Sequence, residues 1–166
     1  MFSVPQRLSP NPYEKAAQFT DMVEVADIEG VTAADIQPEA NLADLDLSGA
    51  TLAGANLSGA NLSGAKITHT DLSGADLSEA TLTGIELTES HLEEGNLDDA
   101  ELTRADLSGA DLTDASLRHA TLTEATLTGA TLRNADLTGA VLREADIDNS
   151  DLSLSRLSHA DATEAD

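Results

Sequence analysis

The chain has 166 residues and a formal net charge of −23, because 31 acidic residues outnumber eight Lys and Arg. It contains no cysteine, which excludes disulfides, thiolate metal sites and a cysteine nucleophile. It has neither a stretch of 18 apolar residues nor an N-terminal apolar run of signal-peptide length, so we expect a cytoplasmic protein with no membrane partner. The negative charge would repel phosphate, which argues against direct binding of nucleic acid.

Residues 1–39 differ from the rest of the chain, and we expect them to form an N-terminal cap. Asn11 followed by Pro12 is typical of a helix start, and apolar residues then recur at helical spacing, which predicts a helix near residues 12–26. Val31 and Ile36 are five residues apart but out of phase with the Leu series that begins at Leu42. They predict a degenerate first turn, joined to that series by a bulge near Pro38.

From residue 40 the sequence repeats every five residues. From Leu42 to Leu157 every fifth residue is Leu or Ile, over 24 consecutive positions without insertion. Two residues before each one stands a small residue, usually Ala, with Leu45 and Ile85 as the large exceptions. A five-residue interval makes no stripe on an α-helix and alternates faces on a flat strand. The backbone must therefore turn once in every repeat.

The residues after each Leu are turn formers. They are mostly Ser or Thr, often followed by Gly, as in Ser58-Gly59 and Thr138-Gly139. An extended Ala-to-Leu segment points both side chains inward, and a right-angle corner then returns the next pair to the same interior. Four repeats close a square, so about six coils would stack about 4.8 Å apart into an all-β solenoid. We expect its core to contain Leu57, Leu62, Leu77, Leu97, Leu117, Leu137 and Leu157.

The motif A-[D/N]-L-[S/T]-x, as in Ala55-Asn56-Leu57-Ser58-Gly59, resembles the pentapeptide-repeat proteins over residues 40–161. The resemblance implies a right-handed quadrilateral β-helix, here with a short N-terminal helical cap. We therefore divide the chain into a cap at 1–39, a β-helix at 40–161 and a C-terminal tail at 162–166. Ala162 stands where another Leu belongs and no capping helix is evident, so we expect a monomer or an end-to-end homodimer.

The acidity has two interpretations. Some pentapeptide-repeat proteins bind DNA gyrase as DNA mimics, which inhibits the enzyme or protects it from quinolones. Against mimicry, residues 1–39 and 40–166 carry nearly the same negative charge per residue, and Lys is scarce, as in proteins of high-salt cytosols. The many central Phe and the C-terminal dimerisation helix of the gyrase-binding members are also missing. We favour a halophilic, non-catalytic scaffold for an unidentified protein partner, with the DNA gyrase or type II topoisomerase mimic as the alternative.

Stacking the coils places residues 20 apart next to one another. Glu79 then lies over Asp99, Glu94 over Asp114 and Glu124 over Glu144, and these six residues form a candidate acidic interaction surface. Most bases gain an acid one coil away, which predicts local ion pairs. These pairs are Lys66 with Asp46 and Glu86, Arg104 with Glu124, Arg118 with Asp98, and Arg156 with Asp136.

Catalysis has little support in the sequence. His91 stacks between Asp71 and Asp111, which could be drawn as a metal ladder, but all three occupy outward positions where surface pairs are the simpler interpretation. His69 stacks above Glu89 in the same way. A filled rod offers no cleft in which a nucleophile and a base could converge. We therefore expect no enzyme activity, no catalytic or metal site and no cofactor.

Overall fold

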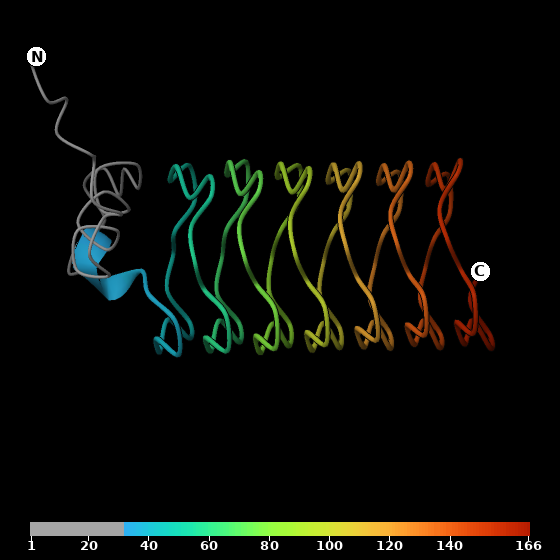
Figure 1. Ribbon diagram of the computed structural model, residues 1–166, viewed down its shortest axis with the longest axis horizontal. Coiled ribbons are helices and arrows are strands. Elements are labelled where there is room, and N and C mark those ends of the chain that lie inside the picture. The colour runs from blue at the N-terminus through green and yellow to red at the C-terminus, as the bar shows by residue number, and fades with distance from the viewer. Residues whose placement is uncertain (1–31) are drawn as a thin grey trace, which may run out of the picture.

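The computed structural model describes residues 32–166, which stack as coils along one axis (Figure 1). The helix predicted near residues 12–26 and the role of Val31 lie outside the described residues. The 3₁₀ helix η1 (Ala33–Asp35) is the only helix of the described part, and it precedes the first coil. The C-terminus lies at the opposite end of the rod (Figure 1).

Parallel β-bridges set the register of the coils. They join each residue before a core Leu to its counterpart in the next coil, from Asn41 with Asn61 to Val141 with Asp161. Partners are always 20 residues apart, so each coil contains four five-residue repeats, as predicted. The bridges are isolated rather than gathered into strands, because each extended segment is too short between its corners for a continuous ladder.

The corners explain how a five-residue interval keeps one face inward. The residue two positions after each core Leu adopts a left-handed conformation, with φ between +53° at Glu89 and +74° at Gly139. The next N–H donates back to the Leu carbonyl, as Ala60 does to Leu57 at 3.0 Å. Glycine occupies nine of the 24 corners that follow Leu42 to Leu157 and other residues occupy fifteen, so the stacking holds many side chains in a conformation that L-residues disfavour.

The core is aliphatic and fills the rod. Leu57, Leu62, Leu77, Leu97, Leu117 and Leu137 are at most 2% exposed, and the Ala residues beside them are equally buried. Ile85, one of the two large residues in the Ala position, is 1% exposed, and Leu45 is partly buried against the core. The prediction for Leu157 was wrong. It is 45% exposed, because no coil of the described chain packs over it.

Both ends of the repeat region differ from the sequence-based expectation. In place of the degenerate first turn expected before Ile36, Ala33–Asp35 forms η1, and Asp35 accepts hydrogen bonds from the backbone N–H and hydroxyl of Thr32. Ile36 still contributes to the core, at 6% exposure. Residues 162–166, expected as a tail, continue the repeat, with Glu164 at φ +60° and Asp166 donating its N–H to Ala145.

Candidate interaction surface

The side chain of the motif Asp or Asn accepts hydrogen bonds from the corner that follows it. In Asp71 one carboxylate oxygen accepts the Ser73 N–H at 3.0 Å and the Ser73 hydroxyl at 2.7 Å. The hydrogen bond from the Ser73 hydroxyl is the main reason that the pKa of Asp71 lies below its ordinary value. The carboxyl groups of Asp46, Asp136, Asp151 and Asp161 likewise have lowered pKa values, caused first by the hydroxyl two residues ahead. These acids therefore cap turns, a role that the sequence analysis assigned only to the hydroxyls.

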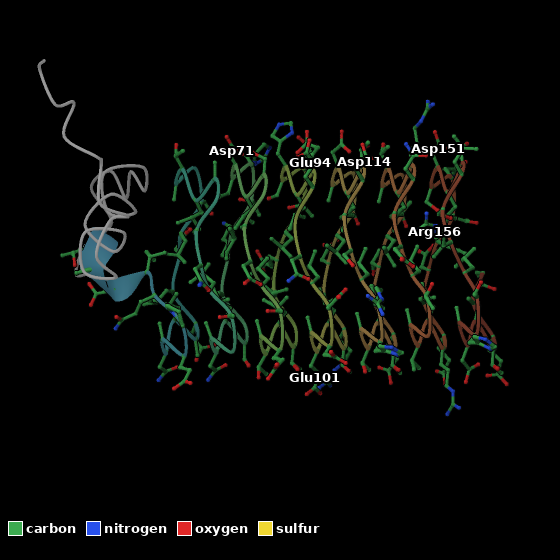
Figure 2. The ribbon with its side chains drawn as sticks, viewed as in Figure 1. Asp71, Glu94, Glu101, Asp114, Asp151 and Arg156 are labelled. Atoms are coloured by element: carbon green, nitrogen blue, oxygen red, sulfur yellow. The ribbon has the colours of Figure 1, made fainter. Side chains whose placement is uncertain are left out.

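The corner acids are available to a partner. Glu94 and Asp114 occupy successive corners of one column, both exposed, with φ of 58° and 59° (Figure 2). The other four residues of the predicted surface stand at corners in the same way, one coil apart within each pair. They are Glu79 with Asp99, and Glu124 with Glu144. All six project from the edges of the rod and do not converge on one another in a cleft.

Negative charge is uneven along the rod. The coil of residues 81–100 contains six acids and neither Lys nor Arg. They are Glu86, Glu89, Glu93, Glu94, Asp98 and Asp99. The coil of residues 121–140 contains two acids, Glu124 and Asp136, and Arg133. The mean negative charge per residue is nearly the same in residues 1–39 and 40–166. The difference between coils appears only when the residues are assigned to coils.

The His91 ring contacts a glutamate two residues ahead on its own turn. The bridges place His91 between Asp71 and Asp111 as expected, but its Nδ1 lies 3.1 Å from Glu93 Oε1. Glu93 Oε2 is buried without a hydrogen-bond partner, beside a shallow hollow lined by Ser73, Gly74, Glu93 and Glu94. Within residues 32–166 no group of three or more His, Asp or Glu is placed to hold a metal ion.

Ion pairs between neighbouring coils join residues that are 20 apart, as predicted, and also residues that are 18 apart. Arg156 pairs with Asp136 at 3.5 Å, which confirms that prediction, and His69 lies 3.0 Å from Glu89. Lys66, Arg104 and Arg118 make no ion pair with any described acid. Two arginines that directly follow a core Leu reach instead to an Asp 18 residues ahead. These pairs are Arg143 with Asp161 at 2.6 Å and Arg133 with Asp151 at 3.9 Å.

The last described coil exposes two leucines. Leu154 is 76% exposed and Leu157 45% exposed, and they are the only exposed large hydrophobic residues in the described part of the chain. Leu154 also occupies a corner, at φ +64°, where polar residues or Gly usually stand. End-to-end pairing through this coil remains a prediction. No helix of residues 32–166 is long and apolar enough to span a membrane.

A filled rod of square coils built from five-residue repeats defines a quadrilateral class of β-solenoid. The model of the pentapeptide repeats matches residues 40–84, 80–118, 120–158 and 135–166, in eight copies. The chain belongs to the pentapeptide-repeat family, whose members form right-handed quadrilateral β-helices. No curated protein matches the chain.

Several solved structures are similar. HetL, a pentapeptide repeat protein involved in heterocyst differentiation regulation from the cyanobacterium Nostoc sp. strain PCC 7120, is 27% identical over 76% of this chain and 87% of its own, with a TM-score of 0.40. A pentapeptide repeat protein from the Arabidopsis thaliana thylakoid lumen is 31% identical over 57% and 69%, with a TM-score of 0.49. QnrB1, a plasmid-mediated fluoroquinolone resistance protein, is 19% identical over 78% and 70% in one structure, and its TM-score of 0.56 supports the shared fold.

Proposed function

We propose that this chain is a cytoplasmic, non-catalytic scaffold for protein–protein interaction, with an acidic surface adapted to high salt. The observation that carries the proposal is the division of the acids into two groups. One group caps corners, whereas the corner acids such as Glu94 and Glu144 bond to nothing in the described chain and stand on the edges of a rod without a cavity. A partner can reach these side chains from several sides.

Salt adaptation follows from the stacking of like charges. Carboxylates in neighbouring coils repel one another, and in molar salt the screening length falls to about 3 Å, which removes most of that repulsion. The test is a titration of the full chain from molar potassium chloride to dilute buffer, followed by far-ultraviolet circular dichroism. We expect the solenoid spectrum in high salt and its loss in dilute buffer. A fold that persists unchanged in dilute buffer would overturn salt adaptation.

Partner binding is tested separately, in salt that keeps the rod folded. Immobilised chain is exposed to cytosol of its own source, and captured proteins are compared with those held by a variant carrying Glu79→Gln, Glu94→Gln and Glu124→Gln. A partner of the acidic edges is lost on this variant. The matched control is Asp136→Asn, which also removes negative charge but changes a turn-capping residue. Identical captures by all three chains would contradict the proposed surface.

The alternative is a DNA mimic that binds DNA gyrase or another type II topoisomerase. The coil of residues 81–100 favours it, because six carboxylates in a coil that contains no Lys or Arg resemble a short run of phosphates. Duplex DNA carries about one charge per 1.7 Å of axis. The test is gyrase supercoiling titrated with folded chain in the enzyme's native salt. Inhibition near stoichiometry, relieved by neutralising Glu86, Glu89 and Glu94, would establish the mimic, and no effect at large excess would exclude it.

A further inference from the structure

Charge is segregated along one side of the rod, which we call the bipolar side. It is formed by residues 73–79, 93–99, 113–119, 133–139 and 153–159, which the bridges stack as five successive coils. Arg156 lies on this side, between the labelled corner residues Glu94 and Asp114 and the opposite label, Glu101 (Figure 2).

The two ends of the bipolar side carry opposite charge. Its first two coils contain six acids and neither Lys nor Arg. These acids are Asp76, Glu79, Glu93, Glu94, Asp98 and Asp99. Its last two coils contain two arginines and a histidine beside a single acid. These residues are Arg133, Arg156, His159 and Asp136.

Both arginines are loosely held within the chain. The Arg156 side chain is 75% exposed and lies 3.5 Å from Asp136. The Arg133 side chain is 55% exposed and lies 3.9 Å from Asp151, which is beyond hydrogen-bond distance. A guanidinium has five N–H donors, so each arginine keeps donors for a second carboxylate.

An apolar side chain and an open corner lie on one edge of the same side. Leu154 is 76% exposed at its corner. Gly74 occupies the same column four coils earlier, where an added Cβ would meet nothing within 4 Å. The shallow hollow lined by Ser73, Gly74, Glu93 and Glu94 lies at this corner.

A second copy of this chain matches these features when the two rods lie antiparallel. The two-fold axis lies between the copies, perpendicular to both rods, at the coil of residues 113–119. It places each column against the same column of the second copy and reverses the order of the coils. Residues 73–79 therefore face residues 153–159 of the second copy, and residues 93–99 face residues 133–139. Such a contact is closed and self-complementary.

The residues that meet in these four coils are complementary. The opposed pairs are Asp76 with Arg156, Glu93 with Arg133, Glu79 with His159, and Gly74 with Leu154. The remaining acids face an amide, a hydroxyl or a glycine, and none of them faces another acid. They are Glu94 opposite Asn134, Asp98 opposite Thr138, Asp99 opposite Gly139, and Asp136 opposite Asn96. Equal coil spacing in the two rods keeps all these pairs in register.

The coil on the axis meets its own copy. Asp114 faces Asp114 of the second copy at one edge, and Arg118 faces Arg118 of the second copy at the other edge. Opposite charge lies one coil away across the contact in both cases. Arg133 of the second copy lies next to Asp114, and Asp98 of the second copy lies next to Arg118. The two like pairs lower the affinity but leave the register to the four coils around them.

We propose that two copies associate side by side and antiparallel through the bipolar side. Two chains of charge −23 repel at long range, so we expect association in molar salt, where only contacts at a few ångströms persist. One side of a narrow rod is small beside a standard interface of about 800 Å² per partner. The dimer is therefore weak, reversible and dependent on concentration.

The test is sedimentation equilibrium of the full chain in molar potassium chloride over a concentration series. We expect a monomer–dimer equilibrium that Glu93→Arg weakens at least about tenfold, because two guanidinium groups then face each other. Arg133→Glu weakens it in the same way, and the double variant Glu93→Arg, Arg133→Glu exchanges the charges and restores the dimer. Both residues occupy one column, so each substitution introduces a residue type that this column already contains. Far-ultraviolet circular dichroism checks that each variant keeps the fold.

The signs of the charge changes separate this contact from general repulsion. Glu93→Arg makes the chain less negative and Arg133→Glu makes it more negative, so an effect of net charge alone would move the two variants in opposite directions. Arg104→Glu is the matched control. It changes the net charge as Arg133→Glu does, but at a corner away from the bipolar side, and it leaves the dimer intact.

The apolar contact and the axis coil give two further readouts. Leu154→Asn, which repeats the residue of the preceding corner at Asn134, weakens the dimer at least about threefold, because it removes the buried leucine. Asp114→Asn strengthens the dimer, because it removes the like pair on the axis.

Three outcomes would overturn the proposal. They are a monomer at every concentration, failure of the charge exchange to restore association, and a dimer that Glu93→Arg and Arg133→Glu do not weaken. The last outcome is expected of end-to-end association, because Glu93 lies three coils from the last one. The inference goes beyond the scaffold role, since a monomeric chain would still capture a partner in the separate binding test.

Discussion

Glu94 and Asp114 stand one coil apart in the same corner column, both exposed and both in the left-handed region. Like charges directly opposite each other across paired backbone destabilise a sheet, by an amount comparable to the gain from opposite charges. Their column continues with Asn134, at φ 57°, which shows that an amide fits the same corner. This relationship makes the proposed role of salt testable at two positions.

Replacing Glu94 and Asp114 together by Asn should stabilise the rod in low salt. We expect a gain in the free energy of unfolding of about 0.2–1 kcal/mol at the lowest salt concentration that keeps the rod folded, from relieved repulsion between the two carboxylates. In molar salt the gain should shrink, because the wild-type repulsion is then screened. Urea unfolding at several salt concentrations measures both values.

Asp136→Asn is the matched control for this prediction. It also removes one negative charge, but Asp136 lies 3.5 Å from Arg156, so the substitution removes an attraction instead of a repulsion. We expect Asp136→Asn to be neutral or destabilising at the lowest salt concentration that keeps the rod folded. The double variant removes two charges and Asp136→Asn removes one. If Asp136→Asn stabilises the rod by about half as much as the double variant, total charge rather than stacking controls the salt response.

The turn-capping role of the motif predicts a difference between two substitutions at Asp71. Asn keeps a side-chain oxygen that can accept the Ser73 N–H, as Asn56 accepts the Ser58 N–H at 3.1 Å, whereas Ala removes it. We expect Asp71→Ala to cost about 1 kcal/mol, the typical net value of one hydrogen bond, and Asp71→Asn to cost less. Thr131→Ala in the same column is the control, because Thr131 caps no corner. Equal losses for all three would contradict the capping role.

The lowered pKa values give a pH dependence with a definite sign. Hydrogen bonds from Thr138, together with Arg156, favour the charged form of Asp136, so its folded pKa lies below its unfolded value of about 3.9. Its contribution to stability is present above that unfolded value and disappears as pH falls through the folded pKa. The stability difference between wild type and Asp136→Ala should therefore narrow between neutral pH and pH values below the folded pKa. Thermal unfolding of both chains across this range measures it, and a difference independent of pH would contradict the assignment.

The sequence predicts the square coils and their register well, because the repeat pattern constrains the backbone strongly. An unbroken Leu or Ile at every fifth residue, with turn formers after it, requires a corner in each repeat, and the register of 20 follows from the square. The interior of each coil then depends on two positions, Ala and Leu. These two positions vary least among the repeats in the type of residue that occupies them.

The surface was less predictable, because its contacts depend on side-chain reach rather than on register. The stacking of residues 20 apart correctly predicted the pair of Arg156 with Asp136. Arg143 instead reaches Asp161, 18 residues ahead, because its side chain starts at a corner and extends toward the neighbouring position of the next coil. The turn-capping of Asp71 could have been found from the Asp-Leu-Ser spacing, which is typical of a side chain that accepts the N–H two residues ahead. The uneven charge required counting by coil. The exposure of Leu157 required knowing which coil lies beyond it.

Ser90 and Thr70 form a buried polar pair that supports the last prediction. In ordinary corners the Ala N–H donates directly to the Leu carbonyl, as Ala75 does to Leu72 at 2.9 Å. At Thr70 the hydroxyl of Ser90 stands between the two groups, accepting the Thr70 N–H at 3.4 Å and donating to the Ile67 carbonyl at 2.5 Å. Both residues are at most 1% exposed, in a column that also contains buried Ala50, Ala110 and Ala130.

Ser90→Ala should destabilise the rod by about 1–3 kcal/mol, because it leaves the N–H of Thr70 and the carbonyl of Ile67 without their bridge in a buried place. Thr70→Ala with Ser90→Ala should cost less than the sum of the single substitutions, since Ala at both positions lets the corner close by the direct hydrogen bond seen at Ala75. We expect a coupling of at least about 0.5 kcal/mol in a double-mutant cycle measured by urea unfolding in molar salt. Ala130→Ser, which places a hydroxyl in the same column opposite an ordinary corner, is the control and should also destabilise. Additive single costs would show that the hydroxyl of Ser90 does not replace the corner hydrogen bond.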